Sequence, residues 1–280
     1  MKRFGTVDAD RDIMSSYREM RPPAHLAKHV ECFWWRRPGE GPTAAAILPD
    51  GCVDIIWVDG LDPFVAGPAT LPVQPVIDSS AGICGVRFRP GVGRHILSID
   101  LHEVRDRHAL LRDLWSHGQF AVFAEATERP TLAARLDAVS ALLAERLGTG
   151  TDTDALVRDA VTWIVAHPRC RAEGIAQRYG VSDRQMRRRF VQSVGYGPKT
   201  LQRVLRMQRV LWLANADTRV APNLVRLAHA AGYADQAHMS RELATLTGLT
   251  PRQLLLGARR DCAVSDLFKT TVGRDATMAF

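Results

Sequence analysis

The sequence contains few cysteines, and their spacing fits neither a disulfide framework nor a metal site. Five occur among 280 residues, at Cys32, Cys52, Cys84, Cys170 and Cys262. Their number is odd and no two form a C-x-x-C pair, which argues against paired disulfides and against structural zinc. We therefore expect reduced thiols, no metal site and no cofactor.

Long apolar runs are also absent. No stretch approaches the roughly 20 residues that a membrane-spanning helix requires, and residues 1–12 lack the apolar region of a signal peptide. The expected location is therefore the cytoplasm, with no membrane partner. No Ser-His-Asp arrangement, phosphate-binding loop or metal-ligand pair stands out either, so the sequence does not predict an enzyme.

Lysine is scarce in the second half of the chain, although that half is strongly basic. Residues 155–280 contain 20 Lys+Arg, of which 18 are Arg, against 9 Asp+Glu. The rest of the chain contains 17 Lys+Arg against 21 Asp+Glu, and the formal net charge of the whole is +7. Arg makes bidentate contacts with phosphate and with guanine edges that Lys cannot make. This asymmetry predicts that the C-terminal half meets a polyanion.

A weak internal repeat with an offset of 53 residues relates the segments 175–198 and 227–251. The positions that keep this offset are Met186 and Met239, Arg188 and Arg241, Phe190 and Leu243, Gly195 and Gly248, and Pro198 and Pro251. Each copy has the pattern of a short helix, a Gly turn and a second helix, which Ser182 or Asp235 can cap. Such a repeat predicts two helix-turn-helix units in tandem and therefore DNA binding.

The second helix of each copy has an apolar and a polar face. The residues spaced i,i+4 on the apolar face, Met186 and Phe190 in the first copy, are expected to face the core. Several Arg share the opposite face of the first copy, where they repel one another unless an anion lies between them. A solvated surface gains nothing from this arrangement, whereas a DNA groove does. The candidate DNA-reading residues are Arg184, Gln185, Arg187, Arg188, Gln236, Ala237, His238, Ser240 and Arg241.

A long helix, opened by Pro198 and covering residues 199–216, is predicted between the two units. Its length suits recognition helices about one DNA turn, roughly 34 Å, apart. Its arginines suit either phosphate contact or a salt-bridged surface. The phosphate-contact candidates are Ser182, Lys199, Arg203 and Arg206. Because the first copy is strongly basic and the second chemically mixed, each monomer is expected to read an asymmetric site.

Several segments of the C-terminal half match a known bacterial pattern. They are Ile175-Ala176, Gly180-Val181-Ser182, Met186, Arg188, Phe190, Gly195-Tyr196-Gly197-Pro198, Arg206, Gly232-Tyr233-Ala234-Asp235-Gln236, Ser240-Arg241 and Gly248-Leu249-Thr250-Pro251. Through them, residues 155–256 resemble the DNA-binding domain of the AraC/XylS family of bacterial transcriptional regulators. The resemblance implies seven helices in two subdomains, with both recognition helices in successive major-groove segments. Met239 and Leu243 replace the usual Phe, and Glu242 is an unusual acid that bears on how closely the second helix approaches phosphate.

The N-terminal half is predicted to be β-rich, because short apolar runs alternate with Gly and Pro turns. The predicted strands are 30–35, 44–48, 53–58, 73–77 and 82–88, followed by helices near 93–97 and 110–126. The segments Cys32-Phe33-Trp34-Trp35, Pro49-Asp50-Gly51-Cys52-Val53-Asp54 and 85–91 resemble the N-terminal domain of an uncharacterised group of the same family. That resemblance implies a small sensor or dimerisation domain without fixing a ligand. A cupin-like arrangement is one form such a domain could take.

The aromatic residues of this half have two interpretations. They form the core of a small sheet with charges at its surface, which is the favoured interpretation, or they line an apolar effector pocket in which charges orient a ligand. The candidate pocket residues are Trp34, Trp35, Asp54, Trp57, Arg87 and Arg89. An amphipathic helix over 131–147 either packs on its own domain, the favoured interpretation, or pairs with a second copy.

These patterns predict an α+β chain with a β-rich domain followed by an all-α domain. The expected divisions are a sensor or dimerisation domain (1–128), a connecting helix and hinge (129–153), a double helix-turn-helix domain (154–257) and a flexible tail (258–280). The predicted function is sequence-specific transcription regulation, with double-stranded DNA, RNA polymerase, a small-molecule effector and a second subunit as expected partners. The alternatives are a weakly specific DNA-binding adaptor and a DNA-alkylation sensor enzyme. The enzyme would need a four-cysteine zinc site or a Pro-Cys-His-Arg segment, and the sequence contains neither.

Overall fold

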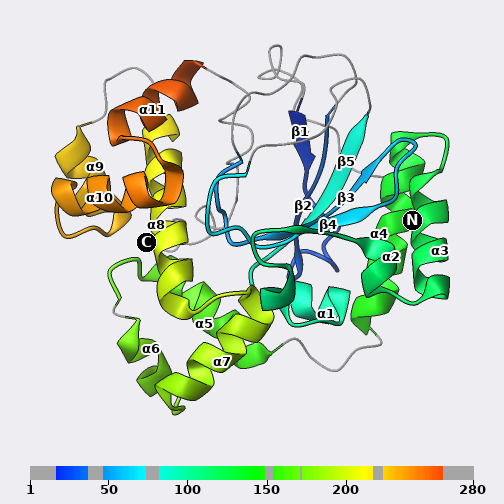
Figure 1. The fold of residues 1–280 in the computed structure, drawn as a ribbon, viewed down its shortest axis with the longest axis horizontal. Helices are drawn as coiled ribbons and strands as arrows, with labels where there is room; N and C mark the ends of the chain where they lie inside the picture. The colour runs from blue at the N-terminus through cyan, green and yellow to red at the C-terminus, as the bar shows by residue number, and fades with distance from the viewer. Residues whose placement is uncertain are drawn as a thin grey trace.

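The protein has an N-terminal part built on an antiparallel sheet and a C-terminal part built of helices (Figure 1). The computed structural model describes residues 17–36, 47–73, 82–148, 154–170, 172–216 and 223–260. This order of parts confirms the predicted α+β class, with the sheet preceding the helical domain.

Six strands form one antiparallel sheet in the order β1-β2-β5-β3-β4-β6. They are β1 (Tyr17–Met20), β2 (Val30–Arg36), β3 (Val53–Val58), β4 (Phe64–Ala66), β5 (Ile83–Phe88) and β6 (His108–Leu110). The predicted runs 30–35, 53–58 and 82–88 are the central strands. Both faces of these strands bury apolar side chains, because successive residues of a strand point to opposite faces.

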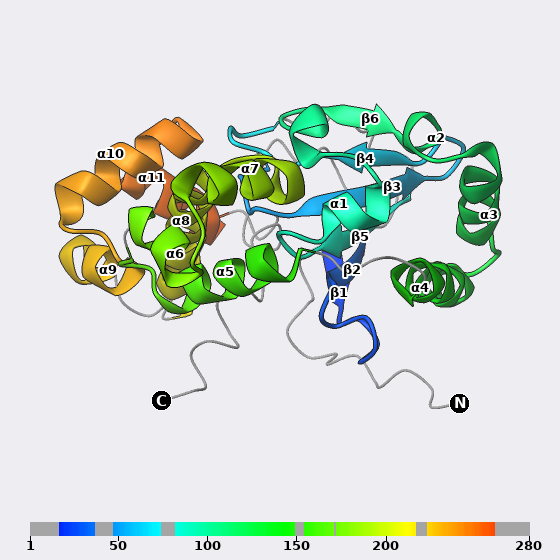
Figure 2. The ribbon, with the colours of Figure 1, turned by 90° about the horizontal axis from the view of Figure 1, so that it is seen from below.

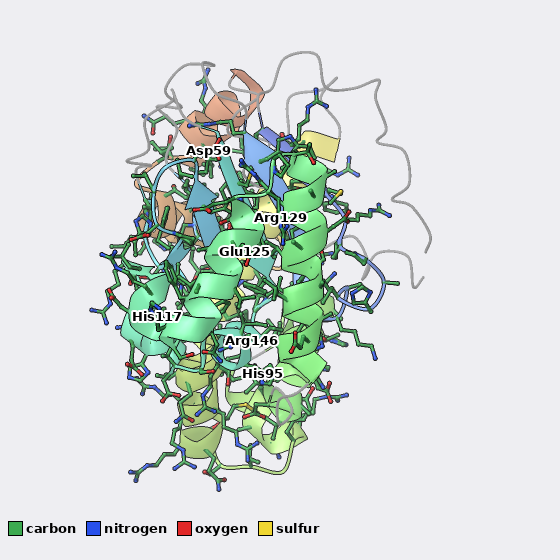
Figure 3. The ribbon with its side chains drawn as sticks, turned by 90° about the vertical axis from the view of Figure 1, so that its right-hand side faces the viewer. Asp59, His95, His117, Glu125, Arg129 and Arg146 are labelled. Atoms are coloured by element: carbon green, nitrogen blue, oxygen red, sulfur yellow. The ribbon has the colours of Figure 1, made fainter. Side chains whose placement is uncertain are left out.

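Helices cover one face of this sheet. They are α1 (Gly93–Leu97), the 3₁₀ helix η1 (Leu101–Val104), α2 (Leu111–Leu114), α3 (His117–Thr127) and α4 (Leu132–Gly148). The helix predicted over 131–147 is α4, and it buries Leu136, Val139 and Leu143 in the core beneath the sheet. Figure 3 shows α3 and α4 side by side, with Arg146 near the end of α4. The Arg146 guanidinium lies 4.4 Å from the centroid of the Trp115 ring. Helix α4 therefore packs on its own domain.

The predicted helix over 110–126 is wrong as a single element. Strand β6 ends at Leu110, the short α2 follows, and Trp115 leaves the helical path to enter the core, where its Nε1 donates to the Ile96 carbonyl at 3.2 Å. Ser116 then caps α3, since its Oγ accepts a hydrogen bond from the backbone N–H of Gln119. A buried Trp and a strong N-cap residue thus divide the segment.

The described strands do not show the two facing sheets of a cupin. They follow one linear order with β1 and β6 at the edges, and helices, not a second sheet, cover the core face. Of the strands predicted over 44–48 and 73–77, the described part is an isolated antiparallel bridge between Ile47 and Val73. The remainder of both predictions lies outside the described residues.

Seven helices make up the described C-terminal part. They are α5 (Ala155–Ala166), α6 (Glu173–Arg178), α7 (Asp183–Val194), α8 (Pro198–Ala216), α9 (Leu224–Ala231), α10 (Gln236–Thr247) and α11 (Pro251–Arg260). We call α5–α7 the first unit and α9–α11 the second unit. Figure 1 shows the two units at opposite ends of α8. Helix α8 places Leu201 in the core of the first unit, and Val204, Met207, Val210 and Leu211 in that of the second.

The junction between the two parts differs in detail from the prediction. Residues 149–153 of the predicted hinge lie outside the described residues. Asp154, rather than Asp152 or Thr153, caps α5 by accepting a hydrogen bond from the backbone N–H of Val157 at 3.3 Å. At the other end, α11 extends to Arg260, beyond residue 258 where a tail was predicted to begin. Residues 261–280 lie outside the described residues.

Candidate nucleic-acid interface

Helix α7 is the second helix of the first repeat, and its ends are fixed by local interactions. Gly180 in the turn before it has φ +64°, a conformation that an L side chain disfavours. Ser182 caps the helix in a reciprocal arrangement: its Oγ accepts from the Gln185 N–H at 3.2 Å, and Gln185 Oε1 accepts from the Ser182 N–H at 3.0 Å. Gly195, with φ +90°, ends the helix.

The two faces of α7 separate apolar from basic residues as predicted. Met186 and Phe190 are buried in the first unit. Arg184, Arg187 and Arg188 are exposed, and no ion pair joins them to another described residue. Three adjacent cations without an acidic partner among the described residues leave a strongly positive surface, which the phosphate backbone of a nucleic acid can neutralise.

Three other polar residues around α7 have structural partners. Ser182 was predicted to contact phosphate and Gln185 to contact bases. The side-chain oxygens of both residues form the hydrogen bonds that cap α7. Arg189 turns toward α5, where its Nη1 lies 3.3 Å from Asp154 Oδ1. The positive surface of α7 is therefore Arg184, Arg187 and Arg188, which we call the arginine face.

Helix α10 repeats the design in the second unit. Gly232 ends α9 with φ +92°, and Asp235 caps α10 by accepting a hydrogen bond from the His238 N–H at 2.6 Å. Met239 and Leu243 are fully buried. The residues exposed on the opposite face are Gln236, Ala237 and Arg241.

His238 and Ser240 are less available than their positions predicted. The His238 ring lies edge-on to Tyr233, with centroids 5.4 Å apart, and its Nε2 lies 3.7 Å from Glu242 Oε1. The Ser240 hydroxyl donates to the Gln236 carbonyl one turn earlier. The exposed face of α10 is thus mixed in chemistry and includes Gln236, Ala237 and Arg241.

Glu242 points away from the exposed face and toward α8. Its Oε1 accepts a hydrogen bond from Arg203 Nε at 3.1 Å, and its Oε2 lies 3.5 Å from Arg206 Nη2. Arg206 also stacks over Tyr233, whose pKa is raised well above its ordinary value by burial. Arg203 and Arg206 therefore hold α10 against α8, and the prediction that they contact phosphate is not supported by their placement.

Of the four phosphate-contact candidates, Lys199 is the one that stays exposed without a partner among the described residues. The role of Glu242 as an inward anchor was missed at the sequence level. Arg203 and Arg206 stand i,i+3 on one face of a helix that is otherwise largely apolar on that side, and this pattern could have indicated a buried acidic partner.

The two recognition helices share one scaffold. Helix α8 has 19 residues, which at about 1.5 Å per residue gives a length of roughly 28 Å. In Figure 2, α7 and α10 lie on one side of α8, with α6 and α9 on the other. The predicted spacing of about one DNA turn is compatible with a helix of this length.

The candidate effector pocket of the N-terminal domain does not assemble as predicted. Trp34, Asp54 and Arg87 lie together on one face of the sheet, while Trp57 and Trp35 pack against the core on the other face. Trp57 meets Phe123 edge-on, with centroids 5.9 Å apart. The prediction of one pocket lined by all the candidates is therefore wrong, because neighbouring residues of a strand point to opposite faces.

The charged members of that set form a buried network. Asp54 accepts hydrogen bonds from Arg87 Nε and Nη2, both at 3.1 Å, and from Trp34 Nε1 at 2.9 Å. Asp50 Oδ2 lies 3.5 Å from Arg87 Nε. Burial raises the pKa of Asp54, against the opposing effect of Arg87, which stays charged beside the carboxylates. Arg89 is separate from the network and pairs with Glu31 at 3.4 Å.

Metal and membrane sites are not found in the part of the chain that the structure describes. There, no three His, Cys, Asp or Glu side chains gather in a way that could hold a metal ion. No helix in the same residues has both the length and the apolar character needed to cross a membrane.

Two capped helix-turn-helix units on a shared helix, one with an exposed arginine face, define a DNA-binding protein. Residues 175–256 match the family described as a helix-turn-helix domain, and residues 18–110 match a domain of unknown function, DUF6597. The C-terminal domain is of AraC type, and the chain is a transcription regulator that joins this domain to an N-terminal DUF6597 domain.

Similar solved structures include ToxT from Vibrio cholerae. One crystal form has 10% sequence identity, covers 86% of this chain and 98% of that chain, and has a TM-score of 0.44. The structure of unsaturated fatty acid-bound wild-type ToxT from strain SCE256 has 11% identity, covers 91% and 97% of the two chains, and has a TM-score of 0.42. No curated protein matches the chain.

Proposed function

We propose that this regulator reads an asymmetric DNA site by placing α7 and α10 in successive segments of the major groove. The observation that carries the proposal is the pair of exposed faces: the arginine face on α7, and Gln236, Ala237 and Arg241 on α10. The capping of both helices fixes the first turn, and these side chains project from the first two turns. A recognition helix contacts base edges with its N-terminal residues, which is where these side chains lie.

The two helices divide the work of binding. The arginine face supplies most of the salt-dependent affinity, because three cations that have no acidic partner among the described residues release counter-ions from DNA. Gln236 suits adenine, Arg241 suits guanine, and Ala237 suits the methyl group of thymine, so α10 contributes more sequence discrimination. Lys199, at the start of α8, adds a phosphate contact.

The N-terminal domain is the regulatory part in this proposal. It contacts the first unit at the end of α7, where Gln192 Nε2 donates to Asp100 Oδ2 at 3.2 Å and Arg105 Nη1 donates to the Gly195 carbonyl at 3.4 Å. These contacts leave the arginine face uncovered, so regulation would act through the arrangement of the units. Binding of a small-molecule effector or of a second subunit to this domain would change that arrangement. The changed arrangement would then alter how the regulator acts on RNA polymerase.

The proposal is tested by selecting bound sequences from random DNA with the full-length protein. Enrichment of a non-palindromic site is expected, with Arg188→Ala and Arg241→Ala each weakening binding by about 1–3 kcal/mol and relaxing a different half of that site. Arg189→Ala is the matched control, because Arg189 is paired with Asp154. Equal binding to selected and random DNA across a salt series would instead identify the weakly specific adaptor.

A further inference from the structure

A loop of the N-terminal domain, residues 48–52, contacts the scaffold of both DNA-binding units. Leu48 is buried in the core of the second unit, among the side chains of the later part of α8 and of α9–α11. Beside it, the Pro49 carbonyl accepts a hydrogen bond from Gln208 Nε2, from the middle of α8, at 2.6 Å. An apolar residue of one domain thus completes the core of another.

The same loop meets the first unit three residues later. Gly51 packs so closely that an ideal Cβ there would lie 3.0 Å from Leu201 Cδ1 and 3.6 Å from Tyr196 Oη. Leu201 and Tyr196 both belong to the core of the first unit. The φ of Gly51 is +87°, which only glycine adopts without strain. The backbone conformation therefore favours glycine at this position, and a Cβ there would also push the Leu201 side chain aside by a few tenths of an ångström.

The loop is rigidly joined to the sheet behind it. Asp50 Oδ1 accepts a hydrogen bond from the Cys52 N–H at 2.8 Å, and Asp50 Oδ2 lies 3.5 Å from Arg87. Because β3 begins at Val53, the loop continues directly into a central strand. Leu48 and Gly51 are therefore expected to move together with this strand.

We propose that the 48–52 loop determines which spacing between the two DNA half-sites the protein accepts, although the loop itself does not touch DNA. The inference rests on the proposed function, in which α7 and α10 read separate half-sites. The loop lies between the units along α8 and packs against the cores of both, so it restrains how α8 bends and how the units rotate about it. Residues that fix the relative positions of the recognition helices determine which half-site spacing is bound. Residues that contact bases determine which DNA sequence is bound.

DNA geometry makes spacing a sensitive measure of this restraint. One base pair inserted between half-sites moves the second half-site by about 3.4 Å and rotates it by roughly 35°. A rigid pair of units cannot follow such a change, whereas units released from the loop can follow it in part. Loss of the restraint is therefore expected to flatten the dependence of affinity on spacing while each half-site is still recognised.

The test compares two glycine variants on a set of operators. Gly51→Ala introduces a Cβ against Leu201, whereas Gly60→Ala carries similar backbone strain, with φ +83°, and meets nothing within 4 Å. The operators are the site that the wild-type protein selects from random DNA and versions with one base pair added or removed between its half-sites. Dissociation constants are measured by fluorescence anisotropy at fixed salt, with thermal unfolding of each variant recorded alongside.

The wild-type protein and Gly60→Ala are expected to lose roughly tenfold or more in affinity on the altered spacings, the scale of one mismatched base pair. Gly51→Ala is expected to lose about threefold or less. Leu48→Ala should behave like Gly51→Ala, and the volume-conserving Leu48→Met should restore the wild-type preference. Leu71→Ala is the matched leucine control, because Leu71 is exposed in the same domain.

Retention of the wild-type spacing preference by folded Gly51→Ala and Leu48→Ala would overturn the inference. If either variant does not fold, Gln208→Ala removes the loop contact from the α8 side, and an unchanged preference in that variant overturns the inference equally. A wild-type protein that selects a site but tolerates every spacing also overturns it and leaves the proposed function intact. Failure to select any site refutes the proposed function itself.

Discussion

Replacing Glu242 by Ala removes the acidic partner of two arginines that the structure places between α10 and α8. The side chains of Glu242, Arg203 and Arg206 are 15%, 27% and 13% exposed, so the cluster is largely but not fully removed from water. Breaking a fully buried pair costs about 3–5 kcal/mol and an exposed one about 0–1 kcal/mol. We expect a loss of about 2 kcal/mol in the free energy of unfolding, which lies between these limits.

Urea unfolding of the wild-type protein and of Glu242→Ala measures this loss directly. Glu125→Ala is the control, because Glu125 of α3 pairs with the exposed Arg129 just beyond the end of this helix, at 3.0 Å; both residues are labelled in Figure 3. That variant should lose about 0.5 kcal/mol or less. The reasoning is refuted if both variants are equally stable and Glu242→Ala binds DNA more tightly with a steeper salt dependence. That result would mean that Glu242 faces the DNA and repels its phosphates.

Three further predictions each concern a single residue. Arg188→Ala should weaken binding to the selected site by about 1–3 kcal/mol without changing the unfolding midpoint. Arg189→Ala should leave the site preference unchanged. Equal effects of the two variants in a binding titration would contradict the assignment of the arginine face. Asp235→Ala removes the cap of α10 and should cost about 0.5–2 kcal/mol of stability in thermal unfolding, with Asp235→Asn retaining most of it. Burial raises the pKa of Cys84 to about 11, so at pH 8 about 0.1% of this thiol is ionised, against about a quarter of an ordinary one. Alkylation at pH 8, read by mass spectrometry, should therefore leave Cys84 unmodified until urea unfolds the protein.

The C-terminal domain could be predicted well because its signals are local. Ser182 and Asp235 mark helix starts through hydrogen bonds that span three residues, and Gly180 and Gly232 mark turns through their own backbone conformations. Such interactions depend on neighbouring residues in the sequence and not on the fold. The repeat then placed both recognition helices without any knowledge of their packing.

Two features were not predicted, for different reasons: the inward direction of Glu242, and the distribution of the aromatic residues over the two faces of the sheet. Glu242 is satisfied by arginines 36 and 39 positions earlier, so its inward direction depends on how α10 packs on α8. The opposite directions of Trp34 and Trp35 are a local consequence of strand geometry and were predictable once residues 30–35 were interpreted as a strand. Grouping the two in one pocket neglected this alternation.

The pairing of Asp54 with Arg87 depends on the register of the sheet and could not be predicted from the sequence. These residues are directly opposite each other on β3 and β5, 33 positions apart in the sequence, and a shift by one residue would send one of them to the other face. Nothing near either residue in the sequence indicates that partner. Their charges therefore suggested a surface or a ligand site, whereas pairing across the strands buries them.

Helix α8 contributes side chains to two hydrophobic cores, and this has a thermodynamic consequence. Neither core can be lost without removing support from the same helix, so the two ends of the domain are expected to unfold in one cooperative transition. Any ligand that binds the folded form at one end, including DNA held by α7 alone, stabilises the whole helix by mass action. Engagement of one half of an operator would then slow amide hydrogen exchange in α10, which does not yet touch DNA.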